Sequence, residues 1–266
     1  MSKIDPTARV EDGATIGDGT SVGPYCMIGR DVVIGANCKL IGHVHITGHT
    51  SIGDGCTIYP FASLGTPPQS LGYKGEPTKL TIGNDCTIRE SVTMNLGTAS
   101  GRGVTRLGDR AFIMTGSHIG HDCIVGNDVI FANTATLAGH CEVGDYTFIG
   151  GVTALQQFVR IGPQVMIGGL SGVRDDVIPY ALARGAPARL EGLNIVGMRR
   201  RKISRERLTL IRAFFDELFH RPGLFADRLQ SVQHRGDEDP AIAEILTFIS
   251  GGKRPLCMAA DGAADA

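Results

Sequence analysis

Three histidines are spaced so that they could share one site. His118 and His121 are three residues apart, and His140 lies 19 residues after His121. The imidazole side chain changes its charge near neutral pH, so a histidine can act as a general base on a hydroxyl group. Asp122 directly follows His121 and could orient its ring. A lone surface histidine is usually inert, so the elements that carry these residues decide what they can do.

Most of the first 173 residues follow a six-residue period of large apolar side chains. An α-helix has a period of 3.6 and an amphipathic strand a period of 2, so neither requires six. The period is kept at 26 positions: Ile4, Val10, Ile16, Val22, Ile28, Ile34, Leu40, Ile46, Ile52, Ile58, Leu64, Ile82, Ile88, Met94, Leu107, Ile113, Ile119, Val125, Phe131, Leu137, Val143, Ile149, Leu155, Ile161, Ile167 and Val173. A fixed period of this kind predicts a solenoid.

Each six-residue unit reads as a short strand followed by a tight corner. Glycine often follows the apolar residue, as in Ile16-Gly17 and Val125-Gly126, and it tolerates the backbone angles that a corner needs. Three such units close one triangular coil, which buries its apolar side chains against neighbouring coils. His118, His121 and His140 then line one edge of the prism, and His121 occupies a solvent-accessible corner with no packing duty.

Six of the seven cysteines fit the same register. They lie two residues before a periodic apolar position, in a slot that elsewhere holds small residues such as Ala14, Thr20 and Ser117. These six are Cys26, Cys38, Cys56, Cys86, Cys123 and Cys141. The slot predicts small core side chains, and no Cys-x-x-Cys spacing favours a metal or a disulfide. The seventh cysteine, Cys257, lies in the C-terminal tail.

Composition limits the classes of partner and the setting. The 266-residue chain has a net charge of −1, which gives no global field for nucleic acid. No run of about 18 apolar residues predicts a membrane span. The start at Met1-Ser2-Lys3-Ile4 enters the repeat directly and leaves no room for a signal peptide. We therefore expect a cytoplasmic protein.

The pattern changes after Val173, and we expect three regions. Residues 1–190 should form the solenoid, 191–252 a helical domain, and 253–266 a disordered tail. Segment 174–203 reads as a connector, and Ser204 reads as a helix N-cap before an apolar stripe at helical spacing. Residues 224–232 predict a short helix. Asp239-Pro240 begins another helix, which Gly251-Gly252 ends.

Two segments interrupt the repeat, at residues 65–81 and 95–106. Both are rich in Gly, Thr and basic residues, and both contain few large apolar side chains. Loops extruded from a rigid scaffold often carry binding residues, although they can also be tolerated insertions.

Several longer strings of residues lie in and around the repeat. They are Ser117-His118-Ile119-Gly120-His121-Asp122-Cys123, Leu137-Ala138-Gly139-His140, Ile149-Gly150-Gly151, Gln157-Phe158, Gly75-Glu76-Pro77-Thr78, Arg89-Glu90-Ser91-Val92-Thr93, Gly168-Gly169-Leu170-Ser171-Gly172-Val173 and Gly192-Leu193-Asn194-Ile195-Val196-Gly197-Met198-Arg199-Arg200. These strings resemble the UDP-N-acetylglucosamine O-acyltransferases. Hexapeptide repeats alone would be weak evidence because many acyltransferases share them, but the resemblance covers nearly the whole chain.

The resemblance implies a left-handed parallel β-helix with C-terminal helices, assembled as a homotrimer with sites between adjacent prisms. It also implies transfer of an (R)-3-hydroxyacyl chain from acyl carrier protein to the 3-hydroxyl of a UDP-sugar, the first step of lipid A synthesis. No cofactor, metal or covalent intermediate is needed.

The same resemblance assigns roles to individual residues. His121 matches the general base, which Asp122 could orient, and the N–H of Gly139 matches the donor to the oxyanion. Gly169 matches the residue that limits acyl-chain length, and the missing side chain suggests a preference near C12–C16 over C10. Residues that match substrate contacts are His118, His140 and Gln157, with Asn194, Arg200 and Arg201 in the nucleotide-binding region.

A basic run in the connector suggests the carrier partner. Residues 199–207 contain six basic side chains and one acid, Glu206. Acyl carrier protein is strongly acidic, so this run favours partner binding over a merely solvated helix start. The partner-binding residues expected here, besides Arg200 and Arg201, are Arg199, Lys202, Arg205 and Arg207.

The sequence departs from the family pattern mostly at contacts to the substrate. Polar residues usual in the family are replaced at Ser70, Gly72, Leu96, Gln156, Pro187 and Val196. Lys74 could substitute in the first loop, and Asn95 and Gln156 are further expected contacts to the substrate. A paralogue that acylates another UDP-sugar, such as a 3-amino sugar, therefore stays open, as do a coenzyme A-dependent acetyltransferase and a non-enzymatic scaffold.

Overall fold

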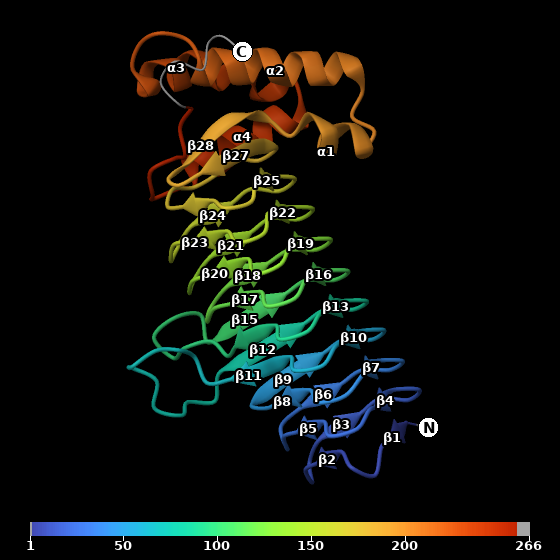
Figure 1. Ribbon diagram of the computed structural model, residues 1–266. Coiled ribbons are helices and arrows are strands. Elements are labelled where there is room, and N and C mark those ends of the chain that lie inside the picture. The colour runs from blue at the N-terminus through green and yellow to red at the C-terminus, as the bar shows by residue number, and fades with distance from the viewer. Residues whose placement is uncertain (1, 260–266) are drawn as a thin grey trace.

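A computed structural model describes residues 2–259 of the chain. The ribbon is a three-faced parallel β-helix that rises from the N-terminus and is covered at its other end by helices (Figure 1). Each of the 26 periodic apolar positions lies on one of the strands β1 to β26, in chain order. The predicted solenoid is therefore confirmed unit by unit.

Successive strands pass from the first face to the second and then to the third. The first face contains β1 (Lys3–Ile4), β4 (Ser21–Val22), β7 (Lys39–Leu40), β10 (Thr57–Ile58), β13 (Thr87–Ile88), β16 (Phe112–Ile113), β19 (Ile130–Phe131), β22 (Phe148–Ile149), β25 (Met166–Ile167), β27 (Ala181–Gly185) and β28 (Ala188–Leu193). The second face contains β2 (Arg9–Val10), β5 (Met27–Ile28), β8 (His45–Ile46), β11 (Ser63–Thr66), β14 (Thr93–Asn95), β17 (His118–Ile119), β20 (Thr136–Leu137), β23 (Ala154–Leu155) and β26 (Gly172–Val173). The third face contains β3 (Thr15–Ile16), β6 (Val33–Ile34), β9 (His49–Ile52), β12 (Lys79–Ile82), β15 (Val104–Leu107), β18 (Ile124–Val125), β21 (Glu142–Val143) and β24 (Arg160–Ile161).

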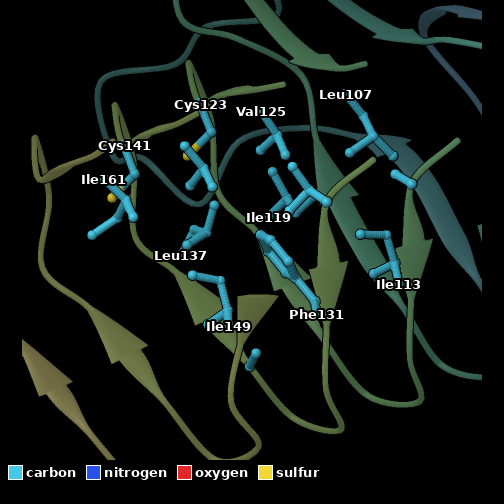
Figure 2. Close-up of a cluster of buried hydrophobic side chains, with 14 of the residues drawn as sticks. Leu107, Ile113, Ile119, Cys123, Val125, Phe131, Leu137, Cys141, Ile149 and Ile161 are labelled. Carbon is cyan, nitrogen blue, oxygen red and sulfur yellow. The ribbon is translucent and has the colours of Figure 1, made fainter. Parts of the chain in front are cut away.

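The inside of the prism is a continuous stack of aliphatic side chains. Figure 2 shows Ile119, Leu137, Ile149 and their neighbours pointing from the three faces toward a shared interior. From β4 to β26 every periodic side chain is buried, because each coil is covered by coils on both sides. The first coil lacks a neighbour, and Ile4 there stays 47% exposed.

The cysteine slot is buried as predicted, and the structure adds a reason for its occupants. The thiol of Cys38 donates to the carbonyl of Gly53, 15 residues on, at 3.1 Å. Cys123 makes the same bond to Ala138, and Thr147 makes it to Gly162. A side chain in this slot must be small and can satisfy a backbone carbonyl of the next coil. All seven cysteines are buried.

The edge between the third and first faces is held by a column of Asp and Asn side chains. Oδ1 of Asp145 accepts the backbone N–H of Asn127, whose Oδ1 accepts that of Asp109. The column continues through Asn84 to Asp54. Carboxylates and neutral amides alternate along it, which keeps like charges out of adjacent coils.

The C-terminal cap matches the helix predictions and contains further elements that they missed. α2 (Arg205–Phe219) follows the N-cap Ser204, and α3 (Phe225–Val232) lies in the segment predicted as a short helix. α4 (Pro240–Ser250) has Asp239 as its N-cap and Gly251 as its C-cap. A 3₁₀ turn, η1 (Gln233–Asp237), joins α3 to α4. The predicted connector instead contains the antiparallel hairpin β27–β28 and α1 (Ile195–Arg200). Strong turn residues in this segment concealed its strands.

The prediction of a disordered tail is wrong for residues 253–259. Cys257 is buried, its N–H donates to Asp176 O, and its thiol donates to Ala188 O. Leu190 and Ala259 form a further bridge. This strip packs against the hairpin because Cys257 fills a core position there. Residues 260–266 lie outside the described part of the chain.

Candidate active site

His121 lies on the edge between the second and third faces, in the corner that joins β17 to β18. Its Nδ1 is 2.9 Å from Oδ2 of Asp122, which is the orienting contact expected from sequence. The ring is more enclosed than predicted, because only 13% of its side chain is exposed. Because the carboxylate accepts a hydrogen bond from Nδ1–H, the Nε2 atom of the neutral ring carries no proton and is free to accept one.

Asp122 is fully buried beneath the second extruded loop, residues 95–106. Its carboxylate accepts the backbone N–H groups of Thr98, Arg102 and Gly103 at 2.8–3.1 Å and the Thr98 hydroxyl at 2.6 Å. Its own N–H donates to the hydroxyl of Thr105. The backbone at Asp122 has φ of 61°, so the loop also secures a conformation that few side chains adopt.

These hydrogen bonds settle the charge of Asp122. Burial by itself raises the pKa of a carboxyl, but the bonds from Thr98 and His121 outweigh it, and the pKa of Asp122 is lowered. The carboxylate therefore stays ionised beside His121 throughout the neutral range.

The other two histidines lie beside this pair, as expected from the coil spacing. His140 contacts the edge of the His121 ring, with centroids 4.9 Å apart, and stacks on Phe158 at 4.4 Å. His118 Nδ1 is 2.7 Å from the hydroxyl of Thr93. Burial, joined at each by the His121 charge, lowers the pKa of both His118 and His140. The rings of His118 and His140 are therefore neutral at pH 7.

Gly139 contacts the face of His121. A Cβ atom built at Gly139 would lie 2.5–3.0 Å from three atoms of the imidazole, which is closer than side chains approach. Any larger residue must displace the ring. The backbone of Gly139 is thereby fixed directly beside the candidate base.

The carboxylate of Asp122 also bears on metal binding. His121, Asp122 and His140 are the one group of three candidate ligands within residues 2–259 whose ligand atoms are close enough to hold an ion. The bonds from the loop and from His121 already occupy the carboxylate oxygens. The arrangement suits proton transfer better than metal coordination.

A second region, the first-face cavity, lies across the prism from His121. It has a volume of about 510 Å³, and its lining residues are Asp128, Ile130, Tyr146, Thr147, Phe148, Met166, Leu182, Leu193, Asn194, Ile195, Val196, Gly197, Arg200 and Arg201. The guanidinium of Arg201 stacks on Tyr146, 3.8 Å from the ring centre. Asn194 caps α1 by accepting the N–H of Gly197. The three residues predicted to bind nucleotide therefore meet in one cavity.

The remaining predicted contacts are distributed over the surface. Lys74 is exposed in the first loop, and Gln156 and Gln157 are exposed on the corner beyond His140. Gly169 is exposed on the edge between the first and second faces. Asn95 differs, because it is buried and its amide donates to Thr66 Oγ1 and to Pro67 O. These bonds give Asn95 a structural role at the base of the first loop.

The basic residues of segment 199–207 also differ in their surroundings. Arg199, Lys202 and Arg205 are exposed beside the cavity. Arg207 instead forms a two-point ion pair with Asp239, at 2.6 and 2.9 Å, which joins α2 to the start of α4. Its guanidinium is committed within the chain, and we leave it out of the partner surface.

The positions that depart from the family pattern have equally distinct surroundings. Leu96 is buried in the core, and Val196 is exposed at the cavity rim. Ser70 and Gly72 lie in the first loop, and Pro187 in the turn of the hairpin. Sequence reasoning missed the loop residues that hold Asp122, because a Gly- and Thr-rich segment gives no signal of what it folds against.

Comparison with known families agrees with this fold. Residues 176–257 match the family model described as Udp N-acetylglucosamine O-acyltransferase, domain 2. Residues 105–139 match the bacterial transferase hexapeptide model. Among residues 2–259, no helix has the length and hydropathy needed to span a membrane.

Relatives match over almost their whole length. The acyl-[acyl-carrier-protein]–UDP-N-acetylglucosamine O-acyltransferase of Azorhizobium caulinodans is 55% identical over 97% of this chain and 95% of its own. That of Rhizobium johnstonii is 44% identical over 94% and 92%.

Solved structures agree equally well. The UDP-N-acetylglucosamine acyltransferase of Campylobacter jejuni is 38% identical with a TM-score of 0.92, and covers 97% of this chain and 100% of its own. The enzyme of Francisella novicida is 31% identical with a TM-score of 0.94, over 98% and 95%. The left-handed β-helix expected from the resemblance is confirmed. The chain belongs to the acyl-[acyl-carrier-protein]–UDP-N-acetylglucosamine O-acyltransferase family.

Proposed function

We propose that this protein transfers an (R)-3-hydroxyacyl chain from acyl carrier protein to the 3-hydroxyl of UDP-N-acetylglucosamine, the first step of lipid A synthesis. The observation that carries the mechanism is the His121–Asp122 pair, enclosed by loop 95–106 and bordered by neutral histidines. The names of the relatives supply both substrates.

The chemistry follows from the pair. Nε2 of His121 removes the proton of the sugar hydroxyl as its oxygen attacks the thioester carbonyl. Asp122 keeps the ring in the required tautomer and stabilises the imidazolium that forms. The N–H of Gly139 donates to the oxyanion of the tetrahedral intermediate. When the carbon–sulfur bond breaks, the imidazolium of His121 gives the proton to the departing thiolate, which leaves as the free thiol of the carrier protein, and the ester is complete.

The position of the nucleotide cavity supports assembly of copies. His121 lies where the second and third faces meet, whereas the cavity lies on the first face. One prism cannot present both to the same substrate. A cyclic homotrimer brings the His121 edge of one copy to the first face of the next, which completes each site between neighbours.

The remaining assignments follow from charge and position. Arg200 and Arg201 suit the diphosphate, because guanidinium groups bond phosphate oxygens in pairs. Arg199, Lys202 and Arg205 offer an acidic carrier protein an exposed surface beside the cavity. Gln157, Gln156 and Lys74 remain predicted contacts to substrate. The buried thiols and the nature of both substrates favour a cytoplasmic setting.

The test is acyl transfer by the purified full chain, with mass spectrometry of the product. We expect UDP-N-acetylglucosamine and 3-hydroxyacyl carrier protein to give one 3-O-acylated product. His121→Ala should reduce kcat by about a thousandfold, the usual range for loss of a general base. Full activity of that variant would refute the assignment of the base. Preferential use of a UDP-linked 3-amino sugar would refute the proposed acceptor, and preferential use of acyl coenzyme A would refute the proposed donor.

A further inference from the structure

Arg102 holds Asp122 at two points. Its backbone N–H donates to the carboxylate of Asp122 at 2.8 Å, and its guanidinium Nη1 donates to the carbonyl of the same residue at 2.7 Å. The guanidinium also reaches the carbonyl of His140, one coil further on, at 3.4 Å. A single residue of the loop thus spans the corners that carry His121 and His140.

Glu142 fixes the far end of this guanidinium. It projects from β21 on the third face and forms an ion pair with Arg102 Nη2. The side chains of Arg102 and Glu142 are 36% and 44% exposed, so water screens the pair and its direct contribution to folding is small. Its consequence is geometric, because it ties an otherwise extruded loop to the outside of the prism.

The loop leaves no space above the carboxylate. A Cβ atom at Gly101 would lie 2.5 Å from Asp122 Oδ2 and 2.7 Å from His140 Cε1. The backbone N–H groups of Thr98 and Gly103, which precede and follow Gly101 in the loop, donate to the same carboxylate. Small outward movement of the loop would therefore lengthen several bonds to Asp122 together and admit water.

We propose that Arg102 and Glu142 are positioning residues that clasp loop 95–106 over Asp122 and so fix the orientation of His121. Neither side chain contacts the candidate base itself. The proposal rests on the proposed role of His121 as general base. The geometry of a base matters to its rate because misplacement by about 1 Å can cost up to a hundredfold.

The experiment compares kcat and KM for Arg102→Ala, Arg102→Lys and Glu142→Gln in the full-length protein. We expect Arg102→Ala to lower kcat about tenfold. KM for both substrates should stay within about twofold of wild type, because neither side chain lies in the first-face cavity. Arg102→Lys keeps the ion pair but not the planar fork and should lose less. Glu142→Gln should fall between Arg102→Lys and Arg102→Ala.

A double-mutant cycle separates a clasp from general damage. Glu142→Gln should have no further effect on kcat when Arg102 is already Ala, because the two side chains act through one contact. Independent, additive losses would overturn the proposal. Arg184→Ala removes a comparable exposed ion pair, with Glu191 on the hairpin, and should leave kcat and KM unchanged.

The outcomes distinguish this proposal from the function on which it rests. If His121→Ala is inactive and Arg102→Ala keeps full kcat, the clasp is refuted and the base stands. If His121→Ala retains full activity, the proposed base itself fails. Glu142→Gln, which is isosteric, keeps the test valid should Arg102→Ala fail to fold.

Discussion

The His121 edge and the first-face cavity are built in opposite ways. At the edge, one buried carboxylate receives hydrogen bonds from three backbone amides, a hydroxyl and an imidazole, all from the same chain. The cavity is lined by apolar side chains of the first face and by residues of α1. Its Arg201 is held by a stacking contact with Tyr146.

This difference separates the reaction from the choice of substrate. Proton transfer needs groups fixed within fractions of an ångström, and the single chain supplies them through loop 95–106. The first-face cavity is partly open, and in the homotrimer proposed above it would face the His121 edge of a second copy. Val196, one of the positions that depart from the family pattern, lies at this cavity. The chain therefore fixes its chemistry more firmly than its acceptor.

The largest effect should follow a change at the edge that keeps its shape. Asp122→Asn retains the volume of the side chain but cannot hold the same histidine tautomer. We expect kcat to fall by about a hundredfold or more, with little change in KM for the UDP-sugar. Steady-state kinetics of the folded variant check this. A loss confined to KM would place Asp122 with the substrate contacts and break the distinction between the two regions.

A substitution in the first-face cavity should affect KM rather than kcat. Arg201→Ala removes a guanidinium predicted to bind diphosphate, so we expect KM for the UDP-sugar to rise about tenfold while kcat changes little. Val33→Ala serves as the control, because Val33 is an exposed residue on the third face and does not line the cavity.

Mixing inactive variants tests whether the two regions of neighbouring copies meet. His121→Ala and Arg200→Ala/Arg201→Ala are unfolded and refolded together to give mixed trimers, which are assayed at a UDP-sugar concentration so low that neither variant is active alone. Each mixed trimer contains one interface with both regions intact, so equal mixing should restore about a quarter of wild-type activity. Sites contained within single chains would give no restoration.

A smaller effect is expected at Gly169, on a third edge of the prism. A Cβ there would meet only Gly151, at 3.2 Å from its carbonyl oxygen, so a side chain can be accommodated and would project outward. Gly169→Met should shift the preferred donor from C12–C16 toward C10, by about tenfold in relative kcat/KM. Equal or better use of C10 by the wild-type protein would contradict the assignment.

The sequence alone predicted the edge of the prism that carries the histidines, but it did not predict the loop that covers this edge. The six-residue period fixed which side chains point inward, so it placed His118, His121 and His140 on one edge without any structure. The period ends where the chain leaves the coil, and the bonds from Thr98, Arg102 and Gly103 to Asp122 are therefore invisible in it. The same limit concealed the hairpin after β26 and the packing of Cys257, both of which depend on contacts between distant segments.

The smallest predicted effect concerns acid stability at the edge. Burial lowers the pKa of His140, so the unfolded chain binds this proton more readily than the folded one. Stability should accordingly fall as the pH drops below the ordinary histidine value of about 6.5. In His140→Asn this contribution is absent, so the decrease in Tm between pH 7.5 and about pH 5 should be smaller than in wild type by about 2 °C. Thermal unfolding at the two pH values measures the difference, and loss of the Phe158 stack cancels because it lowers both values alike. An equal or larger decrease in the variant would mean that His140 is not the group that the fold keeps neutral, and that the edge is less enclosed in solution than its hydrogen bonds indicate.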